Sequence, residues 1–258
     1  MKDVQNEQDS RNISIDRVGV SGVSYPIVVL DPEFSEQHTV ARVRMSVSLA
    51  GDTRGTHMSR FIGLLNDFQG KVTLENLEDM VDIIQESLGG EKAQLSFEFP
   101  YFIKRKAPVS RIESYSGYDV VFWSSREKDR FDFILQVRVP VQTLCPCSRE
   151  IAETGAHNQR AYVDISVRMK NLVWIEEIVD IGERAASAPV FSLLKREDEK
   201  YITEFAYSNP RFVEDVAREA VLELEKDDRI TWFRVQVTSQ ESIHNHDAFA
   251  EIERDKRI

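Results

Sequence analysis

The chain has 258 residues, which is enough for one large domain or for two smaller ones that share a core. Its composition, 41% hydrophobic and 30% charged, is that of an ordinary soluble protein, and no apolar run approaches the roughly 20 residues that a membrane span needs. The formal net charge of −11 argues against a general nucleic-acid-binding surface, so an anionic small molecule would need a local basic pocket.

The sequence predicts a cytoplasmic protein. Residues 1–11 are polar and lack the apolar core of a signal peptide. In a reducing compartment the two cysteines of the chain, Cys145 and Cys147, are expected to be thiols, and a disulfide between them would close a small and strained ring.

The first half of the chain changes from an arm to strands and then to helices. Residues 1–24 show little periodicity and predict an irregular arm. A short apolar run over 25–30 follows, and strict alternation predicts a strand over 38–50. Helical spacing then predicts helices over 58–68 and 74–88, the second with Thr73 as its start signal.

Two strands complete the first half, and the second half, from about residue 125, repeats the order. Alternation or apolar runs predict strands, and helical spacing predicts two further helices, over the following ranges: strands at 93–103, 119–124, 131–141, 159–169, 230–237 and 248–252, helices at 174–184 and 210–225. Asn209 and Pro210 are expected to be the N-cap and the first residue of the last helix. The pattern ββααββ thus occurs twice and predicts an arm over 1–24 and two units over 25–125 and 126–258.

The densest group of metal-capable side chains surrounds the two cysteines. In extended geometry Cys145 and Cys147 would face the same side, and the turn at Gly155 could bring His157 back toward them. A thiolate and an imidazole suit Zn²⁺ or a similar ion. The carboxylates of residues 197–199 and Glu204 are all open as a third ligand. The alternative is two small buried side chains and a surface histidine.

Glu214 lies near the start of the predicted helix over 210–225, beside its apolar stripe. A carboxylate there could accept two N–H bonds from the edge of a guanine or a pterin. The alternative is that Glu214 only stabilises the N-terminus of the helix through its dipole.

Histidines mark two further positions. His244 and His246 fall in the turn before the last strand, where they could bind a metal or transfer protons, or could belong to a polar hairpin loop. His57 and Arg60 open the predicted helix over 58–68, where they suit a phosphate group or a plain helix cap. The sequence has neither of the Gly-rich phosphate-binding motifs GxGxxG and GxxxxGK[ST].

Together these stretches resemble one family, the type IB GTP cyclohydrolase I enzymes. The resemblance covers essentially the whole chain and is carried by 55–61 (GTHMSRF), 143–150 (TLCPCSRE), 155–160 (GAHNQR), 209–215 (NPRFVED) and 241–248 (ESIHNHDA).

The resemblance implies an α+β tunnelling fold (T-fold) of two tandem ββααββ units with antiparallel sheets and paired helices on one face. It implies a homotetramer with active sites at subunit interfaces, and neither nucleic acid nor membrane as a partner. The implied reaction is hydrolysis of GTP to 7,8-dihydroneopterin triphosphate and formate with a divalent ion, Zn²⁺ or Mn²⁺.

Roles for individual residues also follow from the resemblance. Cys145 and His157 would be metal ligands, with Glu199 as the third ligand, although Glu197 lies close by. Glu214 would hold the guanine edge.

His244 would be the acid/base, supported by His246. His57 and Arg60 would face the triphosphate. Cys147 receives no settled role.

Two other classes of function remain open from the sequence. A nitrile reductase of the same fold would use a cysteine as the nucleophile toward a deazapurine and would consume NADPH. A purine- or pterin-binding module, or a thiol-based metal store, would bind its ligand without releasing formate. The sequence does not decide the physiological metal, or whether the product feeds folate or a modified tRNA base.

Overall fold

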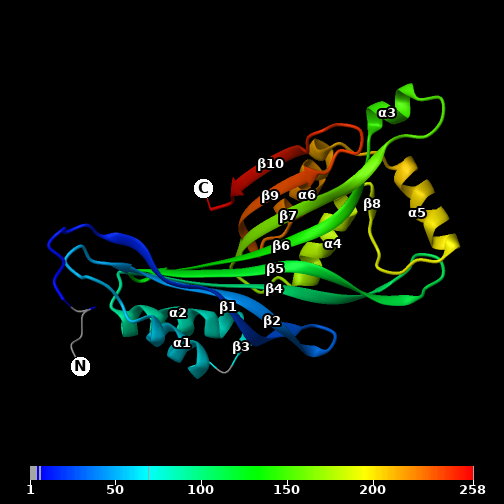
Figure 1. Cartoon of the computed structure of the whole chain (residues 1–258). Helices are drawn as coiled ribbons and strands as arrows, with labels where there is room; N and C mark the ends of the chain where they lie inside the picture. Colours follow the sequence, from blue (N-terminus) through cyan, green and yellow to red (C-terminus); the bar gives the residue numbers. More distant parts are fainter. Residues whose placement is uncertain (1–4, 6, 69, 258) are drawn as a thin grey trace. The chain divides into compact units, whose positions relative to one another are not determined.

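The computed structural model describes residues 5, 7–68 and 70–257. In these residues it has the strands and helices β1 (Ile15–Asp31), β2 (Ser35–Leu49), α1 (Met58–Asp67), β3 (Lys71–Val72), α2 (Leu74–Leu88), β4 (Lys92–Lys106), β5 (Glu113–Glu127), β6 (Arg130–Leu144), α3 (Pro146–Ile151), β7 (Asn158–Met169), α4 (Ile175–Ala185), β8 (Ala188–Pro189), α5 (Arg196–Ser208), α6 (Val213–Lys226), β9 (Ile230–Ser239) and β10 (Ala248–Asp255) (Figure 1). Most paired strands are antiparallel, so the predicted α+β class is confirmed.

The chain divides into two compact units by its internal contacts. Unit 1 is residues 1–100 with 121–134, and unit 2 is residues 101–120 with 135–258. Both units therefore contain parts of β4, β5 and β6. The predicted division into 25–125 and 126–258 concerns a structural repeat and stays a prediction. Among the described residues, no helix combines the length and hydropathy of a membrane-spanning segment.

In unit 1, β2 pairs antiparallel with both β1 and β4, and the short β3 runs parallel to β1. The predicted helices over 58–68 and 74–88 are confirmed as α1 and α2. Thr73 caps α2, because its side chain accepts a hydrogen bond from the Asn76 N–H while its own N–H donates to Asn76 Oδ1. Helices and strands share a buried core of Val43, Met45, Phe61, Leu65, Val81, Ile84 and Phe97.

The prediction of an irregular arm was wrong for residues 15–24, which belong to β1. Two glycines explain why alternation was lost there. A Cβ at Gly19 would lie 2.0 Å from the Met45 carbonyl oxygen, and Gly22 has a positive φ of 71°. The pairing of β1 with β2 shifts register between Ile15 and Val18 and again between Val20 and Val23, where Gly22 lies, so apolar and polar residues no longer alternate strictly. Residues 1–4 and 6 of the predicted arm lie outside the described residues.

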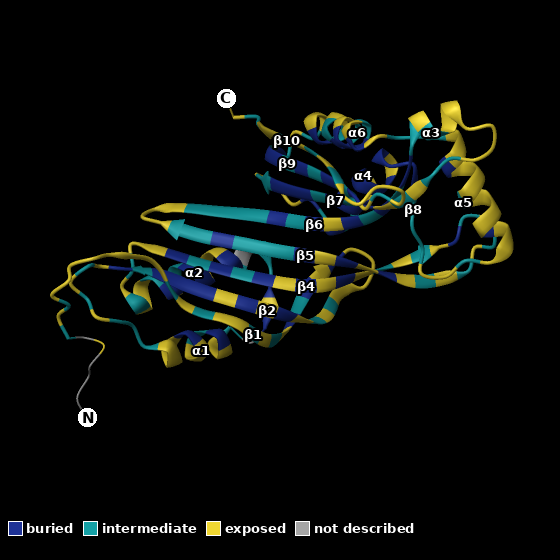
Figure 2. Ribbon diagram, turned by 45° about the horizontal axis from the view of Figure 1, so that its top comes forward, coloured by how far each residue is buried: buried dark blue, intermediate teal, exposed yellow. Residues whose placement is uncertain are grey.

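In unit 2, β6, β7, β9 and β10 pair antiparallel in that order. The short β8 pairs antiparallel with β6 near its C-terminal end, at Val141 and Gln142. The predicted strands and the predicted helix over 174–184 are confirmed. Figure 2 shows the buried positions of β7 and β9 and the exposed side of α5. The core of this unit comprises Val139, Val163, Phe233 and Val237 of the strands and Ile178, Val179, Val216, Ala220 and Leu224 of α4 and α6.

The predicted start of the last helix was wrong. The structure begins α6 at Val213 with Phe212 as its N-cap, and the Phe212 N–H donates to Asp215 Oδ2 at 3.1 Å. Asn209 instead ends α5 and donates its side-chain amide to the carbonyls of Ala186 and Ser187. Because Asn209 is used at the end of α5 and Asp215 bonds to the Phe212 N–H, the helix starts three residues later than expected.

Two helices, α3 and α5, were not predicted from the sequence. The short α3 contains Cys147, so the expectation that Cys145 and Cys147 share one side of an extended chain was also wrong. In α5 the buried residues are Asp198 and Ala206, while the aromatic rings of Tyr201 and Phe205 stack on its half-exposed side. Ile202 and Ala206, four residues apart, pack toward Leu144 and Ala188, so α5 has a short apolar stripe that sequence reasoning missed.

Asp198 fixes the start of α5. Its fully buried carboxylate accepts hydrogen bonds from the Lys195, Val109 and Ser110 N–H groups and from the Ser110 hydroxyl, at 2.6–2.9 Å. Burial alone raises the pKa of Asp198, but these hydrogen bonds outweigh it and hold the pKa below its ordinary value.

We expect Asp198→Asn to lower the melting temperature at neutral pH, because the amide brings an N–H toward other N–H donors. A depressed carboxyl pKa stabilises the fold above its unfolded value of about 3.9, and this contribution is lost as the pH falls through the folded-state pKa. The difference in melting temperature between wild type and variant should therefore shrink below about pH 4. Thermal unfolding by circular dichroism across pH 3–7 measures it, and a difference that grows toward acid would contradict this account.

Candidate active site

The candidate functional side chains of unit 2 lie at the ends of three strands, just beyond the last buried apolar residues. In β6, β7 and β9, every second side chain faces the helices, as in Val139 and Val141, Val163 and Ala161, or Val237.

The next positions of the same face are polar. They are Thr143 on β6, Gln159 on β7 and Ser239 on β9, followed by His157 and Glu241 just beyond the strands. The polar cluster is therefore a continuation of the core face.

A chain of hydrogen bonds connects these polar groups. His157 Nδ1 lies 3.0 Å from Gln159 Oε1, and Gln159 Nε2 donates to Glu241 Oε1 at 3.3 Å. The Ser239 hydroxyl also donates to Glu241 Oε1 at 3.1 Å and lies 3.2 Å from the Thr143 hydroxyl. Thr143 and Ser239 are almost completely buried, so the chain is anchored in the core.

Cys145 and His157 are held at the two ends of one loop. The Cys145 N–H donates to the His157 carbonyl at 3.1 Å, and the His157 N–H donates to Ser148 Oγ, also at 3.1 Å. Cys145 is the N-cap of α3, and its sulfur accepts a hydrogen bond from the Ser148 N–H at 3.4 Å. Pro146 at the first helical position favours the start of this helix.

The remaining groups come from α6 and from the loop after β9. Glu214 lies in the first turn of α6 and is exposed. His244 and His246 stack on each other, with ring centroids 5.3 Å apart and planes inclined by 17°. Arg211 is tied to Asn209 and Glu219 by side-chain hydrogen bonds, and its N–H donates to the Leu144 carbonyl.

These groups line one cavity of about 480 Å³, which we call the site pocket. Its lining residues are Thr143, Cys145, His157, Gln159, Arg211, Phe212, Val213, Glu214, Ser239, Glu241, His244, His246, Ala248 and Phe249. The volume falls within the range that small-molecule sites occupy. Sulfur, imidazole and carboxylate groups thus share a pocket with a few apolar side chains.

The structure brings together Cys145, His157, Glu214, His244 and His246, five of the residues that the sequence singled out. Glu199 does not line the site pocket and is exposed on α5. In the described part of the chain, no three His, Cys, Asp or Glu side chains are close enough together to hold a metal ion, so the set of Cys145, His157 and Glu199 is not assembled there.

His57 and Arg60 belong to unit 1 and do not line the site pocket. His57 is the N-cap of α1 but makes no capping hydrogen bond with its side chain. Cys147 is exposed and also lies outside the lining. The roles of these residues, like those of the pocket residues, remain predictions.

Sequence reasoning missed Thr143, Gln159, Arg211, Ser239 and Glu241. Four of them could have been found by continuing the two-residue period of the strands. Positions 143, 159, 239 and 241 have core parity but carry polar side chains, which indicates a site at the end of the sheet.

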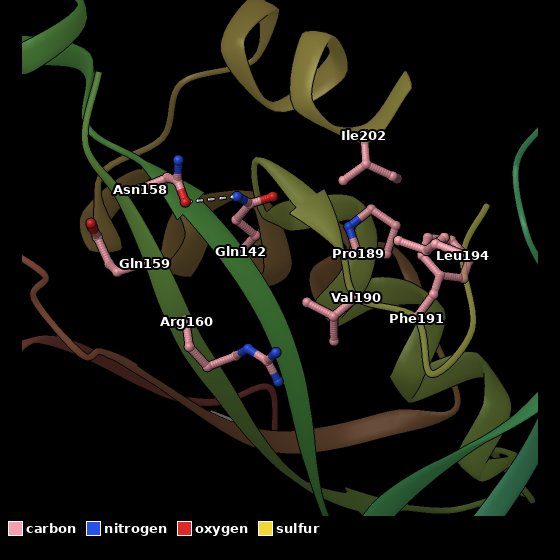
Figure 3. Close-up of a pocket in the computed structure, with 9 residues that line it drawn as sticks. All are labelled: Gln142, Asn158, Gln159, Arg160, Pro189, Val190, Phe191, Leu194 and Ile202. Atoms are coloured by element: carbon pink, nitrogen blue, oxygen red, sulfur yellow. Dashed lines mark hydrogen bonds between the residues drawn. The ribbon is translucent and has the colours of Figure 1, made fainter. Parts of the chain in front are cut away.

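A second cavity of about 350 Å³ lies next to the site pocket and shares Gln159 with it. Figure 3 shows Gln142, Asn158 and Arg160 facing an apolar wall that includes Val190 and Phe191. The Gln142 amide donates to Asn158 Oδ1 at 3.0 Å. Gln142, Asn158 and Arg160 have the opposite strand parity to Thr143 and Gln159, so the two cavities use opposite faces of β6 and β7.

Solved structures of uricases share the fold. The uricase from Arthrobacter globiformis aligns over 93% of both chains with a TM-score of 0.56 and 10% identity. A uricase from Bacillus fastidious aligns over 96% of this chain and 95% of its own with a TM-score of 0.55 and 10% identity. At such low identity these matches define the fold class only, an α+β chain with a mostly antiparallel sheet.

The sequence defines the family. A family model described as type I GTP cyclohydrolase folE2 matches residues 1–250, and the chain belongs to this enzyme family. Its relatives include GTP cyclohydrolase FolE2 of Kosmotoga olearia, 55% identical over the whole length of both chains. The protein of the same name from Geotalea uraniireducens is 52% identical over 100% of this chain and 94% of its own.

We expect Ser148→Ala to loosen the loop between Cys145 and His157, because the hydroxyl accepts the His157 N–H. Loss of one partly buried hydrogen bond should lower the free energy of unfolding by about 1 kcal/mol. Urea unfolding measures this change. The control is Ser208→Ala, which removes an exposed hydrogen bond to the Phe205 carbonyl and should lower the free energy of unfolding less. Ser110→Ala is not used as a control because it breaks the buried hydrogen bond to Asp198.

Proposed function

We propose that this chain is a metal-dependent GTP cyclohydrolase I that hydrolyses GTP to 7,8-dihydroneopterin triphosphate and formate. The family and the names of its relatives support the substrate. The observation that carries the proposal is the site pocket, where Cys145 and His157 share one cavity with Glu214 and with the imidazoles of His244 and His246. These groups supply metal ligands, a purine acceptor and proton carriers.

Two donors of the site pocket, the Cys145 sulfur and the His157 imidazole, are of the kinds that bind a divalent ion such as Zn²⁺ or Mn²⁺, and a third ligand must come from outside the pocket. Cys145 is partly accessible and offers a sulfur, and His157 uses Nδ1 toward Gln159, so that Nε2 remains for a metal. Glu199 is our candidate for a third ligand, with Glu197 as its nearest alternative. When bound, the ion would supply Lewis-acid activation of water.

Glu214 is suited to hold the guanine. A carboxylate only accepts hydrogen bonds, and the N1–H and the amino group of guanine present two donors side by side. The position of Glu214 in the first turn of α6 keeps its negative charge beside the positive end of the helix dipole. The carboxylate therefore selects the guanine edge and orients C8 for attack by water.

His244 and His246 are suited to move protons. Opening of the imidazole ring requires a proton on the departing nitrogen, and release of formate requires a second proton transfer. We assign His244 as the acid/base and His246 as its support, since the two rings stack in the same pocket. A histidine can exchange protons near neutral pH.

Further parts of the proposal rest on the family. They are a T-fold of two tandem ββααββ units over 25–125 and 126–258, a homotetramer, a cytoplasmic location, and His57 and Arg60 as contacts of the triphosphate. The uricase fold supports the first of these. A mass of four chains by light scattering would support the tetramer.

We expect Cys145→Ala and His157→Ala each to abolish formate release from GTP, because each removes a ligand of the activating ion. The measurement is formate release with pterin fluorescence after oxidation, in Zn²⁺ or Mn²⁺. The matched control is His38→Ala, an exposed histidine of β2, which should retain activity. Near-normal turnover in either ligand variant, or a wild-type rate that chelation leaves untouched, would contradict the metal site. Consumption of NADPH would point to the nitrile reductase chemistry instead.

We expect Glu214→Gln to lower kcat/KM for GTP by about 10- to 100-fold, because hydrogen bonds to a charged group contribute about 1.5–3 kcal/mol. Steady-state kinetics with GTP measure the effect. Glu223→Gln changes a glutamate of the same helix that pairs with Lys226, and it should leave kcat/KM unchanged. Equal losses in both variants would mean that Glu214 acts through the helix and not on the guanine.

A further inference from the structure

The hydrogen bonds around His157 have a defined direction. Glu241 is the reference point because an ionised carboxylate can only accept hydrogen bonds. The group that faces Glu241 from Gln159 must therefore be the NH₂ end of the amide, which lies 3.3 Å away. The carbonyl oxygen of the same amide then faces His157 Nδ1 at 3.0 Å.

An amide oxygen is also an acceptor only, so His157 must carry its proton on Nδ1. In a neutral imidazole the other nitrogen, Nε2, is then unprotonated and has a free lone pair. Ser239 lies at the other end of this hydrogen-bond chain, where its hydroxyl donates to Glu241 and can accept from Thr143. Every group from Thr143 to His157 thus has one consistent donor and acceptor role.

Strand geometry holds Gln159 in this position. Its neighbour Arg160 faces the adjacent cavity, and Figure 3 shows the Gln159 side chain directed away from that cavity's apolar wall. Gln159 stands opposite the buried Thr143 in the β6–β7 pairing, so its backbone cannot turn without breaking the ladder.

We propose that Gln159, oriented by Glu241, is a positioning residue that holds His157 in the Nδ1–H tautomer. The inference deepens the proposed function, because it rests on His157 as a metal ligand through Nε2. Outer partners of ligating histidines commonly set ring orientation, and their removal typically costs about 10- to 100-fold in metal affinity. In this role Gln159 is not itself a metal ligand and acts through its hydrogen bond to His157.

The first test measures the tautomer in the metal-free, full-length protein. Long-range ¹H–¹⁵N spectra at pH 8 with ¹⁵N-labelled histidine distinguish protonated from unprotonated ring nitrogens, and the spectrum of His157→Asn assigns the signal. We expect protonated Nδ1 and unprotonated Nε2 for His157 in the wild type. In Gln159→Met the signal should move toward the Nε2–H form, which free imidazole side chains prefer. Wild-type protein with the proton on Nε2 would overturn the inference without any variant.

The second test measures Zn²⁺ affinity by competition with a chromophoric chelator. Gln159→Met should bind Zn²⁺ about 10- to 100-fold more weakly than wild type. Gln142→Met is the matched control, because it removes a glutamine at the same end of the sheet, on the neighbouring strand β6, whose side chain donates to Asn158 on the opposite face. It should change neither the tautomer nor the affinity, and an equal loss in both variants would show a merely structural effect.

An exchange of charges provides the rescue. In the double variant Gln159→Glu with Glu241→Gln, the new carboxylate at position 159 can accept from His157 Nδ1 and from the new amide at position 241. The NH₂ of that amide would stand in place of Glu241 Oε1 and can also donate to the Ser239 hydroxyl, which can then donate to Thr143. Every group keeps a partner at the same net charge, with the roles of Ser239 and Thr143 exchanged. We expect the Nδ1–H tautomer and most of the Zn²⁺ affinity to return. Failure to restore either in a folded double variant would overturn the inference.

The two levels of the proposal can fail separately. Wild-type protein that shows the Nδ1–H tautomer but binds no Zn²⁺ contradicts the proposed metal site and supports the orientation of His157 by Gln159. Protein that binds Zn²⁺ and turns over GTP, with an unchanged tautomer in Gln159→Met, supports the proposed function and overturns the role of Gln159.

Discussion

The alternation of side chains along β6, β7 and β9 is the constraint on which unit 2 depends. On one face of these strands the residues are apolar and buried under α4 and α6 until the last position, where Thr143, Gln159 and Ser239 replace them. A slip of one residue in any pairing would turn these polar groups to the other face and place others in the core. Because the core fixes the register, it also fixes the geometry of the site pocket.

Buried polar groups in this pocket are costly unless they are paired. Thr143 and Ser239 avoid the cost by bonding to each other, and Ser239 continues the chain to Glu241. The hydrogen bonds that satisfy these hydroxyls also fix which group donates and which accepts along the whole hydrogen-bond chain as far as His157. In this part of the protein, stability of the sheet end and orientation of the His157 ring are therefore two results of one network.

Much of this architecture could be predicted from the sequence because its signals are local. Helical spacing located α1, α2, α4 and most of α6, and strict alternation located the central strands.

What failed depended on contacts that a pattern does not contain. Gly19 fits closely against the backbone of β2, and Gly22 has a positive φ where the β1–β2 register shifts. The start of α5 is fixed by hydrogen bonds to the buried Asp198.

The candidate site shows the same division. Cys145, His157, Glu214, His244 and His246 are chemically conspicuous in the sequence and were placed in one pocket by the structure. Gln159 and Glu241 are ordinary polar residues whose importance depends on which atom faces which. Glu199 is exposed on α5 and does not line the site pocket, so its role as third ligand stays a prediction.

The backbone hydrogen bond between Cys145 and His157 has a consequence for the order in which the parts of the site pocket form during folding. Both residues belong to one loop between the paired strands β6 and β7, and closing a loop of about a dozen residues costs little chain entropy and is fast. The Cys145 sulfur and the His157 imidazole can thus come together while the β6–β7 hairpin forms. Glu214 of α6 and the imidazoles of His244 and His246 would join them later. The contact between the Cys145–Pro146 end and the His157 end of this loop would therefore precede completion of the site pocket.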